Sequence, residues 1–304
     1  MSANEVNRDL GGQLGMPSAQ PTRTEGRILA GFMKDRQVEN FAFEMLAGAS
    51  ADVRRAFRAS VDAARRAAAQ LPAEDLSKGV VQPLDPVAEA HVASLRSDPA
   101  VTGPFLGQGW SLDFGVVDLT RVVCLQGCVM DSAEVPPRDQ VGMLRFALPV
   151  PTPVPCDVTV AFDKPPNLPP PITGHATFLG DVPYLNSLAI SFANGQLIFG
   201  SPTHVNLIQV AEHQGRYYLR NGYHRAALLL RNGVVRAPAA IVSGLPPNYQ
   251  MGGADMIPLE EVVSLVRPPL IKDLLGPAAI PFWRRKKRTG KLLRFEAYPT
   301  QVPM

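Results

Sequence analysis

The sequence has few cysteines, no strong excess of one charge and no long apolar run. Its three cysteines, Cys124, Cys128 and Cys156, form an odd set, which disfavours a secreted disulfide framework and favours a reducing compartment, the cytoplasm. No stretch reaches the roughly 18 consecutive apolar residues of a membrane span, and the polar start lacks an export signal, so we expect no membrane contact. A net charge of +3 disfavours a polybasic nucleic-acid binder.

The best-known signatures of catalysis and metal binding are also missing. No Gly-x-x-x-x-Gly-Lys, Gly-x-Ser-x-Gly or His-Glu-x-x-His pattern occurs, which disfavours the commonest nucleotide hydrolases, serine hydrolases and zinc proteases. Cys124 and Cys128 have no second pair to complete a zinc site, so we expect buried thiols and no metal. Enzymatic activity is left open and no catalytic residue is assigned. A general base, if one acts, would be a carboxylate such as Asp181 or Glu212.

Proline, by contrast, is abundant. The chain has 30 prolines, about twice the usual share, and they concentrate in residues 149–171 and 246–281. Because proline fixes φ and removes a backbone donor, these stretches predict loops and extended connections.

Composition divides the chain into a leader, a helical region, a β-rich body and an appendage. Residues 1–24 are polar, which predicts a mobile leader, and residues 25–100 carry helical periodicity. Residues 101–245 are rich in short β-forming runs, and residues 246–304 are proline-rich and contain a basic cluster. We therefore predict an α+β fold, with N-terminal helices followed by a mixed β-rich body.

The clearest helix signal follows Ser50, a good N-cap, after which Val53, Phe57 and Val61 recur at helical spacing. We interpret the arginines on its other faces as a solvated surface, and the alternative is that they bind a nucleic acid or an acidic partner. Further helices are expected over residues 27–46, with a break near Gly31, and over residues 85–95. Strands are expected at residues 116–130, 142–150, 157–162, 176–180 and 188–199, the last with a hairpin turn at residues 194–195.

The most informative stretch is residues 205–242. A hairpin turning at residues 214–215 leads into Asn221 and Gly222, and a short apolar helix follows, which Asn232-Gly233 ends. The first amides of a helix lack intrahelical partners and lie at the positive end of its dipole, so an anion is stabilised there. Arg225 offers a fork for two phosphate oxygens, and His224 offers one more donor.

Gly222, His224 and Arg225, framed by strand, helix and returning strand, resemble the core of the ParB/sulfiredoxin-like superfamily. The resemblance covers residues 205–242 and implies a strand-helix-strand element that binds a nucleoside triphosphate with Mg²⁺, another polyphosphate or a nucleic acid. Sulfiredoxins carry their reactive cysteine where this chain has Tyr223, so reduction of a sulfinic acid is not expected. The resemblance implies a nucleotide- or polyphosphate-binding protein, acting as a nucleotide-dependent switch or a transferase. The expected ligand-binding residues are Arg220, Asn221, Gly222, Tyr223, His224 and Arg225.

Other interpretations of these residues stay open. In a purely structural one, Arg225 pairs with a core carboxylate, His224 caps backbone groups and Tyr223 fills the edge of the core. The chain is then a non-enzymatic interaction or scaffold protein with a protein partner. A third interpretation is a DNA-binding partner, in which Trp283 stacks on bases. The phosphate-neutralising residues are then Arg284, Arg285, Lys286, Lys287 and Arg288.

Overall fold

The computed structural model describes nine ranges of the chain: 23–131, 134–153, 157–162, 172–180, 189–193, 196–200, 203–251, 255–285 and 289–297. Helices and mixed sheets combine in an α+β fold, as the sequence predicted. The predicted leader lies outside these ranges except for Arg23 and Thr24. Within the described part, no helix is both long and apolar enough to cross a membrane.

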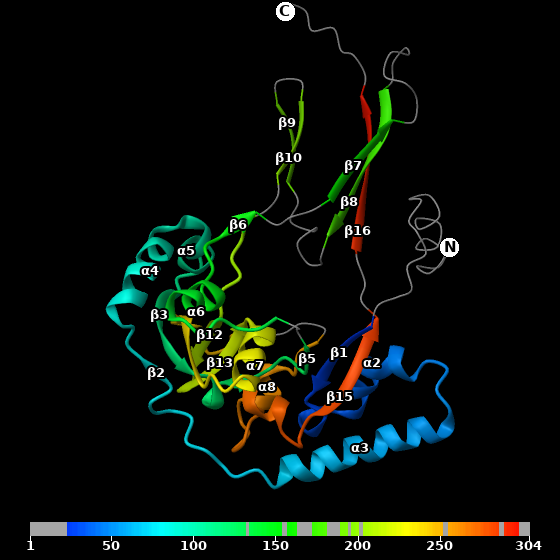
Figure 1. Cartoon of the computed structure of the whole chain (residues 1–304), viewed down its shortest axis with the longest axis vertical. Helices are drawn as coiled ribbons and strands as arrows, with labels where there is room; N and C mark the ends of the chain where they lie inside the picture. The colour runs from blue at the N-terminus through cyan, green and yellow to red at the C-terminus, as the bar shows by residue number, and fades with distance from the viewer. Residues whose placement is uncertain are drawn as a thin grey trace, which may run out of the picture.

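The body is built on a six-stranded sheet in the order β2-β3-β14-β12-β13-β4, of which Figure 1 labels β2, β3, β12 and β13. The β12–β13 hairpin is antiparallel, whereas β14 runs parallel to β12 and β4 runs parallel to β13. The helix α7 (Tyr223–Arg231) connects β13 to β14 and so allows β14 to run parallel to β12. The six strands are β2 (Val81–Gln82), β3 (Ser111–Asp118), β4 (Val123–Cys124), β12 (Gln209–His213), β13 (Arg216–Asn221) and β14 (Arg236–Ser243).

Side chains of successive β13 residues enter different cores, because they point to opposite faces of the sheet. Leu219 packs in a cluster with Leu229 of α7 and with residues of α4 (Pro86–Ser97) and α6 (Gln140–Ala147). Tyr218 is fully buried in a second cluster on the other face, which includes Leu270 and residues of α8 (Leu259–Val262). The sheet is therefore covered on both faces.

A second, three-stranded sheet has β1 (Arg23–Ile28) between β15 (Ile280–Arg285) and β5 (Cys128–Met130). The helices α2 (Asp35–Leu46) and α3 (Ala51–Ala69) pack against it, and Figure 1 shows α3 running beneath β1 and β15. Because β1 pairs with β15, the predicted helical region and the predicted C-terminal appendage share one sheet.

The remaining elements complete the chain. They are η1 (Ala30–Phe32), α5 (Pro99–Leu106), η2 (Leu119–Arg121), η4 (Ile271–Leu275), β6 (Thr152–Pro153), β7 (Asp157–Phe162), β8 (Ile172–Gly180), β9 (Ala189–Ala193), β10 (Gln196–Gly200), β11 (Thr203–His204) and β16 (Thr289–Ala297). The strands β16, β8 and β7 form their own antiparallel sheet, and β9 pairs with β10 as the predicted hairpin requires.

Three predicted elements were wrong. Residues 116–130, expected as a strand, instead contain the end of β3, then η2, β4 and β5, and β5 belongs to a different sheet from β3 and β4. Residues 27–28 belong to β1 rather than to a helix, because the backbone there pairs with β15 and β5; the helix α2 starts only at Asp35. Residues 142–147 form part of α6 rather than a strand. The Asp139 carboxylate caps this helix by accepting a hydrogen bond from the Gly142 amide at 2.7 Å. The predicted cap at Ser50 is confirmed, since its hydroxyl accepts from the Val53 amide.

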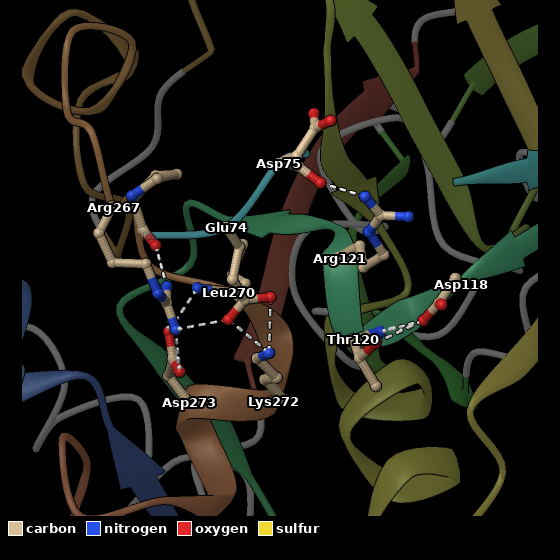
Figure 2. Close-up of polar contacts among 10 residues, drawn as sticks. Glu74, Asp75, Asp118, Thr120, Arg121, Arg267, Leu270, Lys272 and Asp273 are labelled. Carbon is tan, nitrogen blue, oxygen red and sulfur yellow. Dashed lines mark hydrogen bonds and ion pairs between the residues drawn. The ribbon is translucent and has the colours of Figure 1, made fainter. Parts of the chain in front are cut away.

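A network of charged side chains joins η4 to the segment before β2 (Figure 2). The Arg267 guanidinium donates to both carboxylate oxygens of Asp273, with Nη1–Oδ2 and Nη2–Oδ1 distances of 2.9 and 2.7 Å. Lys272 Nζ lies 2.6 and 2.8 Å from the carboxylate oxygens of Glu74. Only 9% of the Arg267 side chain and 5% of the Asp273 side chain are exposed, so this ion pair is largely shielded from solvent.

Candidate functional site

The predicted helix start is present, and glycine is required there. Gly222 has φ of 84°, a left-handed conformation, and a Cβ at this residue would lie 3.0 Å from the Cα of Ile208. No side chain caps the helix that begins here. The Asn221 side-chain oxygen instead accepts from the Gly222 amide at 2.8 Å. The amides of the first turn of α7 therefore have no side-chain acceptor at the N-cap.

Tyr223 points away from any ligand at this helix start. Its side chain is buried in the cluster that contains Leu219, and its hydroxyl donates to the Leu219 carbonyl. Burial raises the pKa of Tyr223 well above its usual range. The position of the Tyr223 side chain therefore fits packing in the core rather than stacking on a base.

His224 lies at the surface of α7 and contacts Met130 of β5, an edge strand of the three-stranded sheet. Its Nδ1 is 3.0 Å from the amide nitrogen of Met130 and 3.2 Å from the Met130 carbonyl oxygen. Desolvation lowers the pKa of His224; the hydrogen bond to Met130 opposes this effect, while the charge of Arg284 adds to it. The neutral ring accepts at Nδ1 from the Met130 amide, which places its proton on Nε2.

Arg225 is tied to backbone oxygens. Its Nη1 donates to the Phe146 carbonyl at 2.6 Å, and its Nη2 donates to the backbone and side-chain oxygens of Asn206, the latter at 2.9 Å. These contacts join the start of α7 to the end of α6 and to the segment that precedes β12. They occupy donors that the sequence analysis assigned to phosphate, and they arise between residues far apart in the sequence.

Arg220 lies on the opposite side of β13 from Leu219 and Asn221, because alternate strand residues face alternate sides. Its guanidinium carbon lies 5.1 Å from the ring centre of Phe105 and 5.2 Å from that of Trp110, which is cation–π geometry. Among the described residues, its buried Nη1 has no hydrogen-bond partner. The structure thus does not bring Arg220 together with His224 and Arg225. The sequence carries no local signal for these aromatic partners.

A cavity of about 690 Å³ lies near the other end of α7. Its walls include Leu230 and Arg231 of α7, Glu25 of β1 and Trp283 of β15. Arg231 forms an ion pair with Asp131, which also lines the cavity. The size falls within the usual range for small-molecule sites. No pattern in the sequence indicates this cavity, since its walls come from elements more than 200 residues apart.

Other predicted groups lie apart from the helix start. Glu212 is exposed and pairs in register with Tyr217, toward the hairpin turn, whereas Gln209 pairs with Asn221 at the opposite end of the hairpin. Asp181 and Cys156 lie outside the described residues, and so do Lys286, Lys287 and Arg288 of the basic cluster. Arg284 of that cluster lies 3.6 Å from the carboxylate of Asp255.

The described thiols, Cys124 and Cys128, are both free and buried. Burial raises the pKa of Cys128 to about 12 and raises that of Cys124 further. Within the part of the chain that the structure describes, no three His, Cys, Asp or Glu side chains cluster in a way that could hold a metal ion.

No protein-family model, curated protein or solved structure matches this chain.

Proposed function

We propose that the chain binds a phosphate-bearing ligand, a nucleoside triphosphate or another polyphosphate, at the start of α7. The observation that carries the proposal is a helix that begins at left-handed Gly222 with no side-chain cap, beside the exposed ring of His224. Uncapped first-turn amides and the helix dipole together favour an anion. The resemblance of residues 205–242 to the ParB/sulfiredoxin-like superfamily supports the same ligand class.

The residues of the loop have distinct roles in this proposal. The first-turn amides and the Nε2 proton of His224 donate to phosphate oxygens. Arg225 is a positioning residue, because its guanidinium donates to the Phe146 and Asn206 oxygens and so holds the helix start against α6. Its positive charge still adds to the potential felt by an approaching anion. Mg²⁺ would arrive bound to the phosphates of the nucleotide. Arg220 has no role, and no reaction is assigned.

Calorimetric titration tests the proposal. ATP, CTP, GTP and inorganic triphosphate are each titrated into the parent protein, with and without Mg²⁺. We expect at least one ligand to bind, and we expect His224→Ala to weaken it about tenfold or more, the usual effect of losing one charge-assisted hydrogen bond. Glu212→Ala is the matched control, since this exposed side chain lies toward the distal end of the hairpin.

Two results would overturn the proposal. The first is that the parent protein binds none of the four ligands. The second is that His224→Ala and Glu212→Ala both bind the ligand as tightly as the parent does. Equal affinity for inorganic triphosphate and the nucleotides would keep the phosphate site and show that the base is not recognised.

A further inference from the structure

The two halves of α3 have different surroundings. In its second half, Val61 and Ala64 are buried, and the helix approaches η1 so closely that a Cβ at Gly31 would lie 2.7 Å from the Ala64 carbonyl oxygen. In its first half, every residue from 51 to 56 is exposed. The start of α3 therefore projects from the body together with the end of α2, to which it is joined by a short turn (Figure 1).

Between these two helix ends lies a groove of about 320 Å³ with apolar walls. Phe43 and Leu46 of α2 and Phe57 of α3 line it. Phe43 is 74% exposed. Single exposed apolar residues are ordinary, but apolar residues gathered along one groove indicate a contact surface.

The rim of the groove carries more positive than negative charge. Arg58 lines the groove, is exposed, and forms no ion pair or hydrogen bond with any described residue. Arg54 also lines it and donates to the Ala49 and Leu46 carbonyls, where it satisfies the end of α2. Glu39 is the one acidic residue among the described groove residues. The groove is thus complementary to an apolar surface flanked by carboxylates.

We propose that the α2–α3 groove docks an acidic amphipathic helix of a partner protein. Apolar side chains at i, i+3 or i+4 and i+7 of that helix fill the space between Phe43 and Phe57, and its flanking carboxylates meet Arg58. A second copy of this chain is a poorer occupant, because a two-fold contact through the groove would bring two positive rims together. This site is independent of the phosphate site at α7.

A labelled acidic amphipathic peptide of about 18 residues, with Leu at the apolar positions and Glu beside them, is the probe. Its binding is followed by fluorescence anisotropy. Two comparison peptides are used: one has Lys in place of Glu, and the other has the acidic composition in an order that gives no apolar face. We expect the amphipathic acidic peptide to bind most tightly. Phe43→Ser should weaken it about tenfold or more, and Arg58→Glu should reverse the preference toward the Lys peptide.

The control variants carry matched changes elsewhere on the surface. Val266→Ser removes an apolar side chain that is 76% exposed, and Arg66→Glu reverses a charge at the far end of α3. Both should bind the acidic peptide like the parent. The proposal is overturned if the three peptides bind alike, or if Phe43→Ser has no effect. It is also overturned if sedimentation shows a dimer of the parent that Phe43→Ser dissociates, since a second copy then covers the groove.

Discussion

Arg267 and Arg225 are both partly buried, and the guanidinium of each joins segments of the chain through hydrogen bonds to different kinds of oxygen. Arg267 contacts both oxygens of the Asp273 carboxylate, and its Nη2 lies 3.8 Å from Glu74 (Figure 2). The contacts of Arg225 with Phe146 and Asn206 go to neutral oxygens. One guanidinium thus stabilises a buried anion, and the other gathers backbone carbonyls from separate segments.

The comparison explains why the sequence was ambiguous at Arg225. Pairing with a core carboxylate was the structural interpretation of Arg225 and stays a prediction there; Arg267 forms such a pair with Asp273, in a proline-rich stretch for which no charged contact was predicted. A nearly buried charge requires an opposite charge, and a partly buried guanidinium also stabilises the carbonyl oxygens to which it donates. Substitutions at the two arginines should therefore differ in cost.

The largest effect is expected from Arg267→Met. Removing the guanidinium leaves the Asp273 carboxylate, 5% exposed, without its cation, so we expect the free energy of unfolding to fall by about 3–5 kcal/mol. Urea unfolding measures the change. Arg96→Met is the control, because Arg96 pairs with Glu89 at a site where about 40% of each side chain is exposed. This substitution should lower the free energy of unfolding by at most about 1 kcal/mol.

The double variant Arg267→Met/Asp273→Leu sharpens the comparison. If the cost of Arg267→Met comes from the unmatched carboxylate, removing that carboxylate as well should restore part of the loss. A double variant that is less stable than the sum of the single changes predicts would contradict this explanation.

A smaller loss, about 1–3 kcal/mol, is expected for Arg225→Ala, because oxygens of Phe146 and Asn206 lose their donors. Arg225→Lys should recover only part of it, since a single ammonium cannot reproduce the fork. Thermal melting and nucleotide titration are run on the same samples. Lower nucleotide affinity at unchanged stability would show that Arg225 acts as a ligand rather than as a positioning residue.

Alanine substitutions at Gly222 and Gly233 test how strongly the backbone is constrained at the two ends of α7. Both have positive φ, 84° and 80°, so alanine should cost about 1–2 kcal/mol at either residue. A Cβ at Gly222 would also press on Ile208 at 3.0 Å, whereas a Cβ at Gly233 meets nothing within 4 Å. We therefore expect Gly222→Ala to be the more destabilising by about 1 kcal/mol in urea unfolding. Equal costs would mean that Ile208 moves aside.

The features that sequence analysis predicted depend on neighbouring residues. The cap at Ser50, the turn at residues 214–215 and the left-handed Gly222 are each decided within a few residues of the chain, and the structure contains all of them. The composition of α6 was misleading, because an almost continuous apolar run fits a buried strand and a buried helix equally well.

The features that it missed depend on contacts between distant segments. The partners of Arg225 lie 19 and 79 residues away, and the pairing of β1 with β15 spans most of the chain. No periodicity records such contacts, so the donors of Arg225 were assigned to a ligand. The sequence favoured a solvated arginine surface on α3 over a surface that binds a nucleic acid or an acidic partner, and it did not indicate the exposure of Phe43 nearby, which depends on how α2 turns into α3.

The smallest effect is expected at His224, which, like Arg225, contacts neutral backbone groups. Its pKa is lowered from the ordinary value of 6.5, so the folded protein binds this proton less readily than the unfolded chain does. Stability should therefore be unaffected well above 6.5 and should fall as the pH drops through 6.5 toward the folded-state pKa. Because the ring is exposed, we expect a loss below about 1 kcal/mol. His224→Gln, which cannot gain a proton, serves as the reference in urea unfolding at about pH 8 and about pH 5. A parent that gains stability on acidification relative to His224→Gln would show that the imidazolium is stabilised by the Met130 carbonyl more than it is opposed by desolvation and Arg284.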